Sequence, residues 1–153
     1  MRKNPSQSKE RENFNMKQAP NFKLPYMFND QLFELEKNHG KVVILTFWAS
    51  WCPDSSRDLP KKEQLFQTMD HDKVQMVTIN VTGRERSEEE ARKYAEQFLT
   101  QPTLTDNGRE VYDLYESDGV PTTVIINQDG DIHAQFGDQA SFLEVVDALG
   151  SLI

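Results

Sequence analysis

One run of six residues, from Val42 to Phe47, constrains the fold of this chain more than any other segment. Its sequence, Val-Val-Ile-Leu-Thr-Phe, is almost entirely apolar and rich in β-branched side chains. A strand that is apolar at nearly every position is typical of a sheet covered on both faces. The only cysteine of the chain, Cys52, follows shortly after this run and precedes a predicted helix.

The rest of the chain alternates between strand-like and helix-like patterns. Ser87 and Ser141 are each followed three residues later by Glu, which predicts a capping box at the start of two helices. The predicted elements are short extended segments within 19–35, a helix from just past Cys52 to about Met69 with Pro60 inside it, a strand over 74–81, a helix after Ser87, a short helix over 111–115, strands over 122–126 and 132–136 joined by a turn, and a last helix to about Leu149. This order predicts an α/β fold with a central mixed β-sheet flanked by helices on both faces.

The first twenty residues differ in composition from the remainder. They contain five Lys or Arg, two Glu and no Leu, Ile or Val. Such a segment buries too little apolar surface to fold, so we expect a disordered polar tail over residues 1–18 and a single domain over 19–153. The basic segment fits an extracytoplasmic protein, membrane-anchored if an N-terminal anchor was trimmed. A cytoplasmic protein is the alternative.

Composition disfavours several function classes. The net charge of −8 argues against nucleic-acid binding, which requires clustered Lys and Arg. One cysteine excludes an internal disulfide, and three scattered histidines give no zinc-ligand spacing. We therefore expect no metal, no cofactor and a monomer. The aromatic residues Phe98, Tyr112 and Tyr115 are expected in the core.

Cys52 lies between an aromatic residue and a proline, where the strand gives way to a helix. At a helix N-terminus the macrodipole and the free backbone N–H groups favour a thiolate over a thiol. We therefore expect an exposed, reactive sulfur. The alternative is a buried thiol that acts only as apolar filling.

Three motifs resemble thioredoxin-like proteins. The segment from Trp51 to Ser55, Trp-Cys-Pro-Asp-Ser, resembles the active-site motif Trp-Cys-x-x-Cys of that superfamily. Val120-Pro121-Thr122 resembles its Val-Pro-Thr, in which the proline is cis and its loop faces the active cysteine. The segments Ala-Pro-Asn-Phe over 19–22 and Phe-Trp-Ala-Ser-Trp-Cys-Pro over 47–53 are similar to the TlpA/ResA branch.

The resemblance implies a thioredoxin-like fold and a thiol–disulfide oxidoreductase with protein thiol or disulfide clients and a reducing partner. The roles that it implies are a nucleophile at Cys52, a proton-handling carboxylate at Asp58, and a substrate-binding surface formed by Trp51, Pro53, Val120 and Pro121. A solvated surface acid is the alternative for Asp58.

The chain departs from this family at Ser55, which occupies the place of the second cysteine. A serine cannot resolve a mixed disulfide, because its hydroxyl is not oxidisable and is a much poorer nucleophile. Three interpretations remain: an engineered Cys→Ser form, a natural monothiol enzyme, or a redox-inactive binding module that holds client thiols or peptides. A peroxidase of the peroxiredoxin class is a weaker option, since Ala49 stands where that class typically has Thr.

Overall fold

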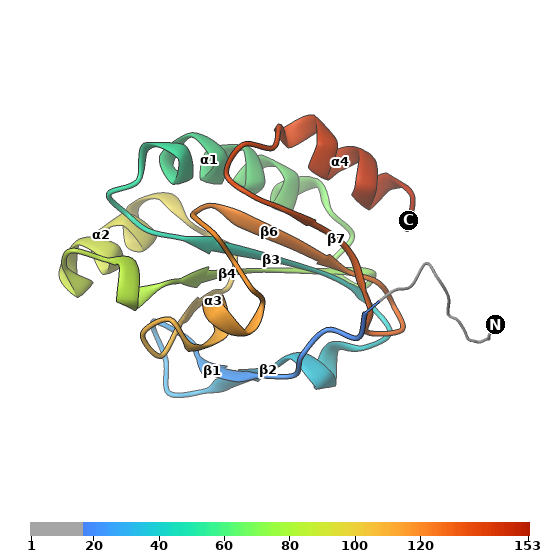
Figure 1. Ribbon diagram of the computed structural model, residues 1–153, viewed down its shortest axis with the longest axis horizontal. Coiled ribbons are helices and arrows are strands. Elements are labelled where there is room, and N and C mark those ends of the chain that lie inside the picture. Colours follow the sequence, from blue (N-terminus) through green and yellow to red (C-terminus); the bar gives the residue numbers. More distant parts are fainter. Residues whose placement is uncertain (1–16) are drawn as a thin grey trace.

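The predicted strand at 42–47 forms the centre of the main sheet. In the computed structural model, which describes residues 17–153, it extends over Val42–Trp48 (β3), and all seven of its residues are buried. The sheet has five strands in the order β5-β4-β3-β6-β7, and a separate two-stranded sheet pairs β1 with β2 (Figure 1). The described residues thus form the mixed α/β fold that the sequence predicts.

The elements begin and end close to their predicted limits. They are β1 (Lys23–Pro25), β2 (Leu32–Glu34), the 3₁₀ helix η1 (Leu35–Asn38), β3, α1 (Pro53–Thr68), β4 (Val74–Asn80), the 3₁₀ helix η2 (Thr82–Arg84), α2 (Glu88–Phe98), β5 (Thr103–Thr105), α3 (Glu110–Leu114), β6 (Thr122–Ile126), β7 (Ile132–Phe136) and α4 (Phe142–Gly150). Both predicted caps are present, because the hydroxyls of Ser87 and Ser141 accept the N–H groups of Glu90 and Glu144.

Strand β3 has a parallel and an antiparallel neighbour. It runs parallel to β4, with Thr46 opposite Thr78, and antiparallel to β6, with Thr46 opposite Thr123. The last residues of β3 therefore lie beside the first residues of β6. This arrangement places the turn that follows β3 next to the loop that precedes β6.

Successive side chains of β3 enter two separate cores. Val43, Leu45 and Phe47 pack in one cluster with residues of α3 and of the β1–β2 sheet. Val42 and Ile44 pack in a second cluster with residues of α1 and α4. Figure 1 shows α1 and α4 along one side of the sheet and α3 with the two-stranded sheet along the other. Helices thus flank both faces, as predicted.

Two details of the fold differ from the predictions. Phe98 is 51 % exposed instead of lying in the core, because it occupies the last turn of α2 beyond the buried positions Ala91 and Ala95. The segment after Pro102, for which no element is predicted above, contains the short edge strand β5, which pairs with β4. Tyr112 and Tyr115 are buried as expected.

Most of the predicted tail lies outside the described residues. Lys17 and Gln18 are described, and both pair with the chain at the start of β7: the carbonyl of Lys17 accepts the N–H of Ile132, and Gln18 forms a β-bridge with Asp131. The folded domain therefore includes these two residues, and our boundary after residue 18 is too late. Among residues 17–153, none of the helices has the length and apolar character needed to cross a membrane.

Removing a side chain from the centre of the sheet should lower stability strongly. Leu45 is fully buried in β3, so Leu45→Ala should lower the free energy of unfolding by about 2–5 kcal/mol through lost burial and an unfilled cavity. Leu143→Ala is the matched control, because Leu143 is 77 % exposed on α4. Urea denaturation measures both; equal midpoints for the two variants would contradict this assignment of the core.

Candidate functional site

Cys52 is the residue immediately before helix α1. It has extended backbone angles as the N-cap, and Pro53 occupies the first turn, where a proline costs no hydrogen bond. The thiol of Cys52 lies 3.3 Å from the backbone oxygen of Val120, to which it donates. The residue is only 8 % exposed, so our expectation of an openly exposed sulfur is wrong. The loop that contains Val120 covers it.

The two predicted halves of the site meet at one edge of the sheet. Val120 and Pro121 come directly before β6, at the edge where β3 ends and its chain turns towards Cys52. The Val120–Pro121 peptide bond is cis, as the resemblance to Val-Pro-Thr implied. The antiparallel pairing of β3 and β6 thus brings together residues that are 68 positions apart in the sequence.

Ser55 lies on the inner side of α1, one turn after the thiol. It is buried, and its hydroxyl accepts the backbone N–H of Ala49 at 3.4 Å. The position of the family's second cysteine is therefore occupied by a group that stabilises the turn between β3 and α1. Pro53 and Arg57 are exposed, and Arg57 forms an ion pair with the half-buried Asp54.

Asp58 is not a freely solvated surface acid. Its carboxylate accepts a hydrogen bond from the ammonium of Lys62 at 2.8 Å, and its side chain is 17 % exposed. The side chain of Lys62 is completely buried, and burial lowers the pKa of its amine while the neighbouring Asp58 opposes that shift. Lys62 is not recognisable as a site residue from the sequence, because a Lys-Lys-Glu run on a helix is typical of a solvated face.

A second unpredicted residue, Glu85, fixes the turn before the cysteine. Its carboxylate accepts the backbone N–H of Ser50 at 2.6 Å, the hydroxyl of Ser50 at 2.7 Å and the amide of Asn80 at 2.6 Å. Charge-assisted hydrogen bonds of this kind are among the strongest in proteins. The segment that contains Glu85 therefore holds the active-site turn from the side of β4.

Trp51 contacts the same segment. Its indole N–H donates to the backbone oxygen of Arg84, and the guanidinium of Arg86 lies 4.9 Å from the centre of its ring. The side chain of Arg84 itself donates to the hydroxyl of Tyr112, which joins the segment after β4 to α3. Trp51 is half-buried, and it packs against the core cluster that includes Cys52.

Within residues 17–153, no group of three or more His, Cys, Asp or Glu side chains is arranged to hold a metal ion. The structure gathers the predicted residues Cys52, Pro53, Ser55 and Asp58 on the first turns of α1, and sets Val120 against the thiol. The chemistry available to this arrangement is that of a single thiol.

Comparison with known proteins places the chain in a family. Residues 16–135 match the model of the AhpC/TSA family. The chain belongs to this family. It is 36 % identical over 120 residues to thioredoxin-like protein YneN of Bacillus subtilis, covering 76 % of this chain and 69 % of the relative. It is 31 % identical over 116 residues to thiol-disulfide oxidoreductase ResA of Halalkalibacterium halodurans, covering 75 % of this chain and 64 % of that protein.

Solved structures confirm the thioredoxin-like fold of this AhpC/TSA member. A putative thiol:disulfide interchange protein DsbE from Chlorobium tepidum superposes with a TM-score of 0.74 at 26 % identity, over 88 % of this chain and 97 % of that one. StoA from Bacillus subtilis gives a TM-score of 0.72 at 23 % identity, over 86 % of this chain and 97 % of that one.

Loosening the turn before the thiol should expose the sulfur. Glu85→Gln removes the negative charge and replaces one carboxylate oxygen by an N–H₂ group, which cannot accept, so at least one of the three hydrogen bonds that Ser50 and Asn80 donate is lost. We expect a loss of about 1–3 kcal/mol of stability and faster alkylation of Cys52 by iodoacetamide at fixed pH. Glu88→Gln, an exposed site in the first turn of α2, is the matched control. Alkylation rates that agree between the two variants would contradict a role for Glu85 at the turn.

Burial of Lys62 should give stability a distinct pH dependence. Its pKa in the folded protein lies below the ordinary value of 10.5, so the unfolded chain binds more protons as pH approaches 10.5. The cost of burying the ammonium is thus present at neutral pH and disappears as pH rises. Relative to Lys62→Met, the parent protein should gain stability between neutral pH and 10.5, measured by urea denaturation. A difference in unfolding free energy between the parent and Lys62→Met that stays constant with pH would contradict this effect of burial.

Proposed function

We propose that this protein is a thiol–disulfide oxidoreductase that acts through the single nucleophilic cysteine Cys52. The observation that carries the proposal is the contact between the thiol and the backbone of Val120, at the N-terminus of a helix. It sets the one cysteine beside the loop that the resemblance assigns to client binding. The related proteins that are named thiol-disulfide oxidoreductases support the same chemistry.

The first step is the attack of the Cys52 thiolate on a client disulfide. One S–S bond forms between Cys52 and the client, the client's own S–S bond breaks, and the second client sulfur leaves as a thiolate. Because Ser55 cannot resolve this mixed disulfide, an external thiolate must attack the new bond and release Cys52. The external thiol is the reducing partner of the proposal.

Four residues around the thiol would hold the client. Val120 and Pro121 are buried in the loop beside the sulfur, and we propose that an extended client peptide pairs with their backbone as an added strand. Trp51 and Pro53 form the opposite border, and both retain exposed surface. Recognition through backbone hydrogen bonds would tolerate many client sequences.

We propose that the negative charge of Asp58 influences the ionisation of the Cys52 thiol. It lies six residues after Cys52 on the same helix, a rise of about 9 Å, so it does not take the proton by direct contact. Ser55, one turn from each of them, is the intervening hydroxyl. The peroxidase alternative is disfavoured because Ala49, three residues before the thiol, offers a methyl group in place of a hydroxyl.

We also propose that the protein works outside the cytoplasm. This placement rests on the net charge of +3 in the first twenty residues and on the TlpA/ResA-like motifs. Fractionation of cells that express the complete gene product tests it. Recovery of the protein in the cytoplasmic fraction alone would overturn the placement and leave the chemistry untouched.

Restoring the second cysteine should allow catalytic cycling. Ser55 lies one helical turn after Cys52, a spacing at which two cysteines can form a disulfide. Ser55→Cys should therefore raise the rate of insulin reduction with excess dithiothreitol several-fold above that of the parent protein. The assay follows the turbidity of the released insulin chain.

The double variant Cys52→Ser, Ser55→Cys is the control for this experiment. It contains the same number of cysteines as the parent but lacks the proposed nucleophile, so it should reduce insulin no faster than dithiothreitol alone. Rates for both the parent and Ser55→Cys that do not exceed the rate of dithiothreitol alone would favour the redox-inactive binding module, because dithiothreitol can resolve a mixed disulfide at a competent thiol.

A further inference from the structure

The most unusual group outside the proposed chemistry is the ammonium of Lys62. Lysine is among the residues least often found fully buried, yet this side chain has no exposed surface. Its amine donates to the carboxylate of Asp58 at 2.8 Å, to the hydroxyl of Thr123 at 2.8 Å and to the hydroxyl of Thr46 at 3.2 Å. These three acceptors match the three N–H bonds of a charged ammonium.

The partners of Lys62 come from the elements that build the thiol site. Asp58 belongs to α1, which begins directly after the cysteine, and Thr46 belongs to β3, which precedes the cysteine. Thr123 belongs to β6, which begins directly after Pro121. The positions Ser55, Asp58 and Lys62 are spaced by three and four residues, so they form one row on the inner side of α1. A polar row therefore runs from the position of the missing cysteine to a buried cation.

We infer that Lys62 is a positioning residue of the thiol site, which fixes the Asp58 carboxylate and compensates its negative charge. This inference rests on the proposed function of Cys52. Without the ammonium, the carboxylate on the inner side of α1 would act on the thiolate as an uncompensated anion of like charge. Lys62 thus makes it possible to keep a carboxylate close to a sulfur that must ionise.

Several other charged groups around the site have partners of their own. Asp54 at the start of α1 pairs with Arg57, and Glu85 is bound to Ser50 and Asn80. Arg86 lies over the ring of Trp51. The acceptors that β3 and β6 offer to the ammonium of Lys62 are the uncharged hydroxyls of Thr46 and Thr123. Asp58 is thus the charged group through which Lys62 acts.

The test follows the ionisation of the sulfur itself, because the ultraviolet absorbance of a thiolate does not require the thiol to react. With one cysteine in the chain, the signal that disappears in Cys52→Ser belongs to Cys52. Lys62→Met should move the midpoint of this titration to higher pH by about half a unit or more, because it leaves the Asp58 charge uncompensated. Near-ultraviolet circular dichroism checks that each variant is folded.

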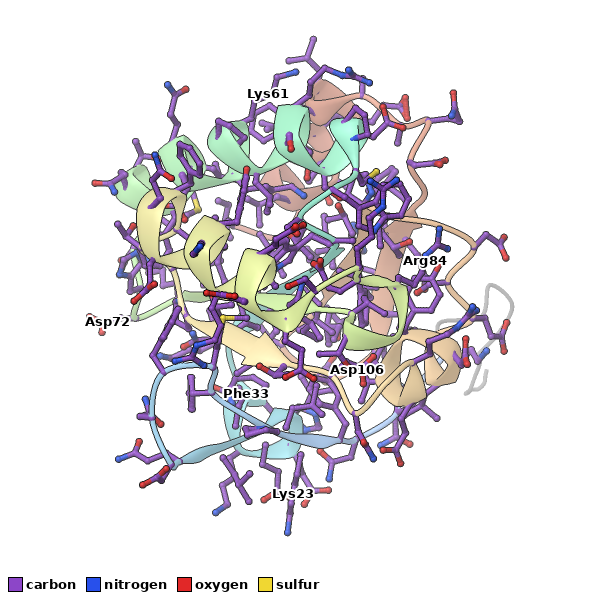
Figure 2. All side chains as sticks on the ribbon, turned by 90° about the vertical axis from the view of Figure 1, so that its left-hand side faces the viewer. Lys23, Phe33, Lys61, Asp72, Arg84 and Asp106 are labelled. Atoms are coloured by element: carbon purple, nitrogen blue, oxygen red, sulfur yellow. The ribbon has the colours of Figure 1, made fainter. Side chains whose placement is uncertain are left out.

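Two further variants separate this role from simple packing. In Asp58→Asn, the added change Lys62→Met should no longer raise the midpoint, because the anion that Lys62 compensates has been removed. Lys61→Met is the matched control: it removes the same charge from the preceding residue, which lies exposed on the outer side of α1 (Figure 2). It should move the midpoint by less than about 0.2 pH unit.

Thr123→Val provides a test that keeps every charge and nearly the same shape. It removes one acceptor of the ammonium, so it should raise the midpoint in the same direction as Lys62→Met and by a smaller amount. If Lys62→Met does not fold, this variant decides the question.

Midpoints that are unchanged in folded Lys62→Met and Thr123→Val, or that rise equally with and without Asp58, would overturn the inference. A parent protein whose sulfur ionises but never forms a mixed disulfide would overturn the proposed function instead.

Discussion

The antiparallel pairing of β3 with β6 is the constraint on which the thiol site depends. It aligns Phe47 with Thr122, so the chain leaving β3 towards Cys52 and the chain entering β6 from Val120 occupy the same edge of the sheet. The 3.3 Å contact between the thiol and the backbone oxygen follows from that register. A shift by one residue would turn the side chains of β6 to the opposite face and would separate the two halves of the site.

Two charged side chains, the half-buried Glu85 and the fully buried Lys62, support this geometry from different sides. Glu85, in the segment after β4, accepts a hydrogen bond from the turn before Cys52. Lys62 joins α1 to β3 and β6 through hydrogen bonds to Thr46 and Thr123. Both are satisfied by hydrogen bonds, which is the condition under which charged groups are tolerated away from water. A charged network costs desolvation, but it permits few alternative arrangements of the elements that it joins. We attribute the fixed position of the buried thiol to these two groups together with the loop at Val120.

Much of the fold was predictable because local patterns and tertiary structure agree. The apolar run at Val42 marked the central strand, and the serines at 87 and 141 marked the starts of two helices. The short strand β5 was not predictable, since three residues acquire their conformation only by pairing with the edge of β4. Phe98 was misassigned because helical periodicity does not show where a helix extends beyond the core.

The candidate site was only partly predictable for a related reason. Cys52, Val120 and Pro121 stand in motifs, but the burial of the thiol depends on a loop that reaches it from the far half of the chain. Glu85 and Lys62 stand in charged runs, Arg-Glu-Arg and Lys-Lys-Glu, whose composition is that of exposed surface. Only the three-dimensional contacts distinguish these two residues from their solvated neighbours.

The central claim is that the sulfur of Cys52 exchanges with a disulfide while the protein is folded. Intact-mass spectrometry of the native protein, incubated with a disulfide-linked peptide, tests it most directly. We predict the gain of one peptide mass, its absence in Cys52→Ser, and its loss when an external thiol is added. A native protein that gains no mass, under conditions in which the urea-unfolded chain does, would contradict the claim.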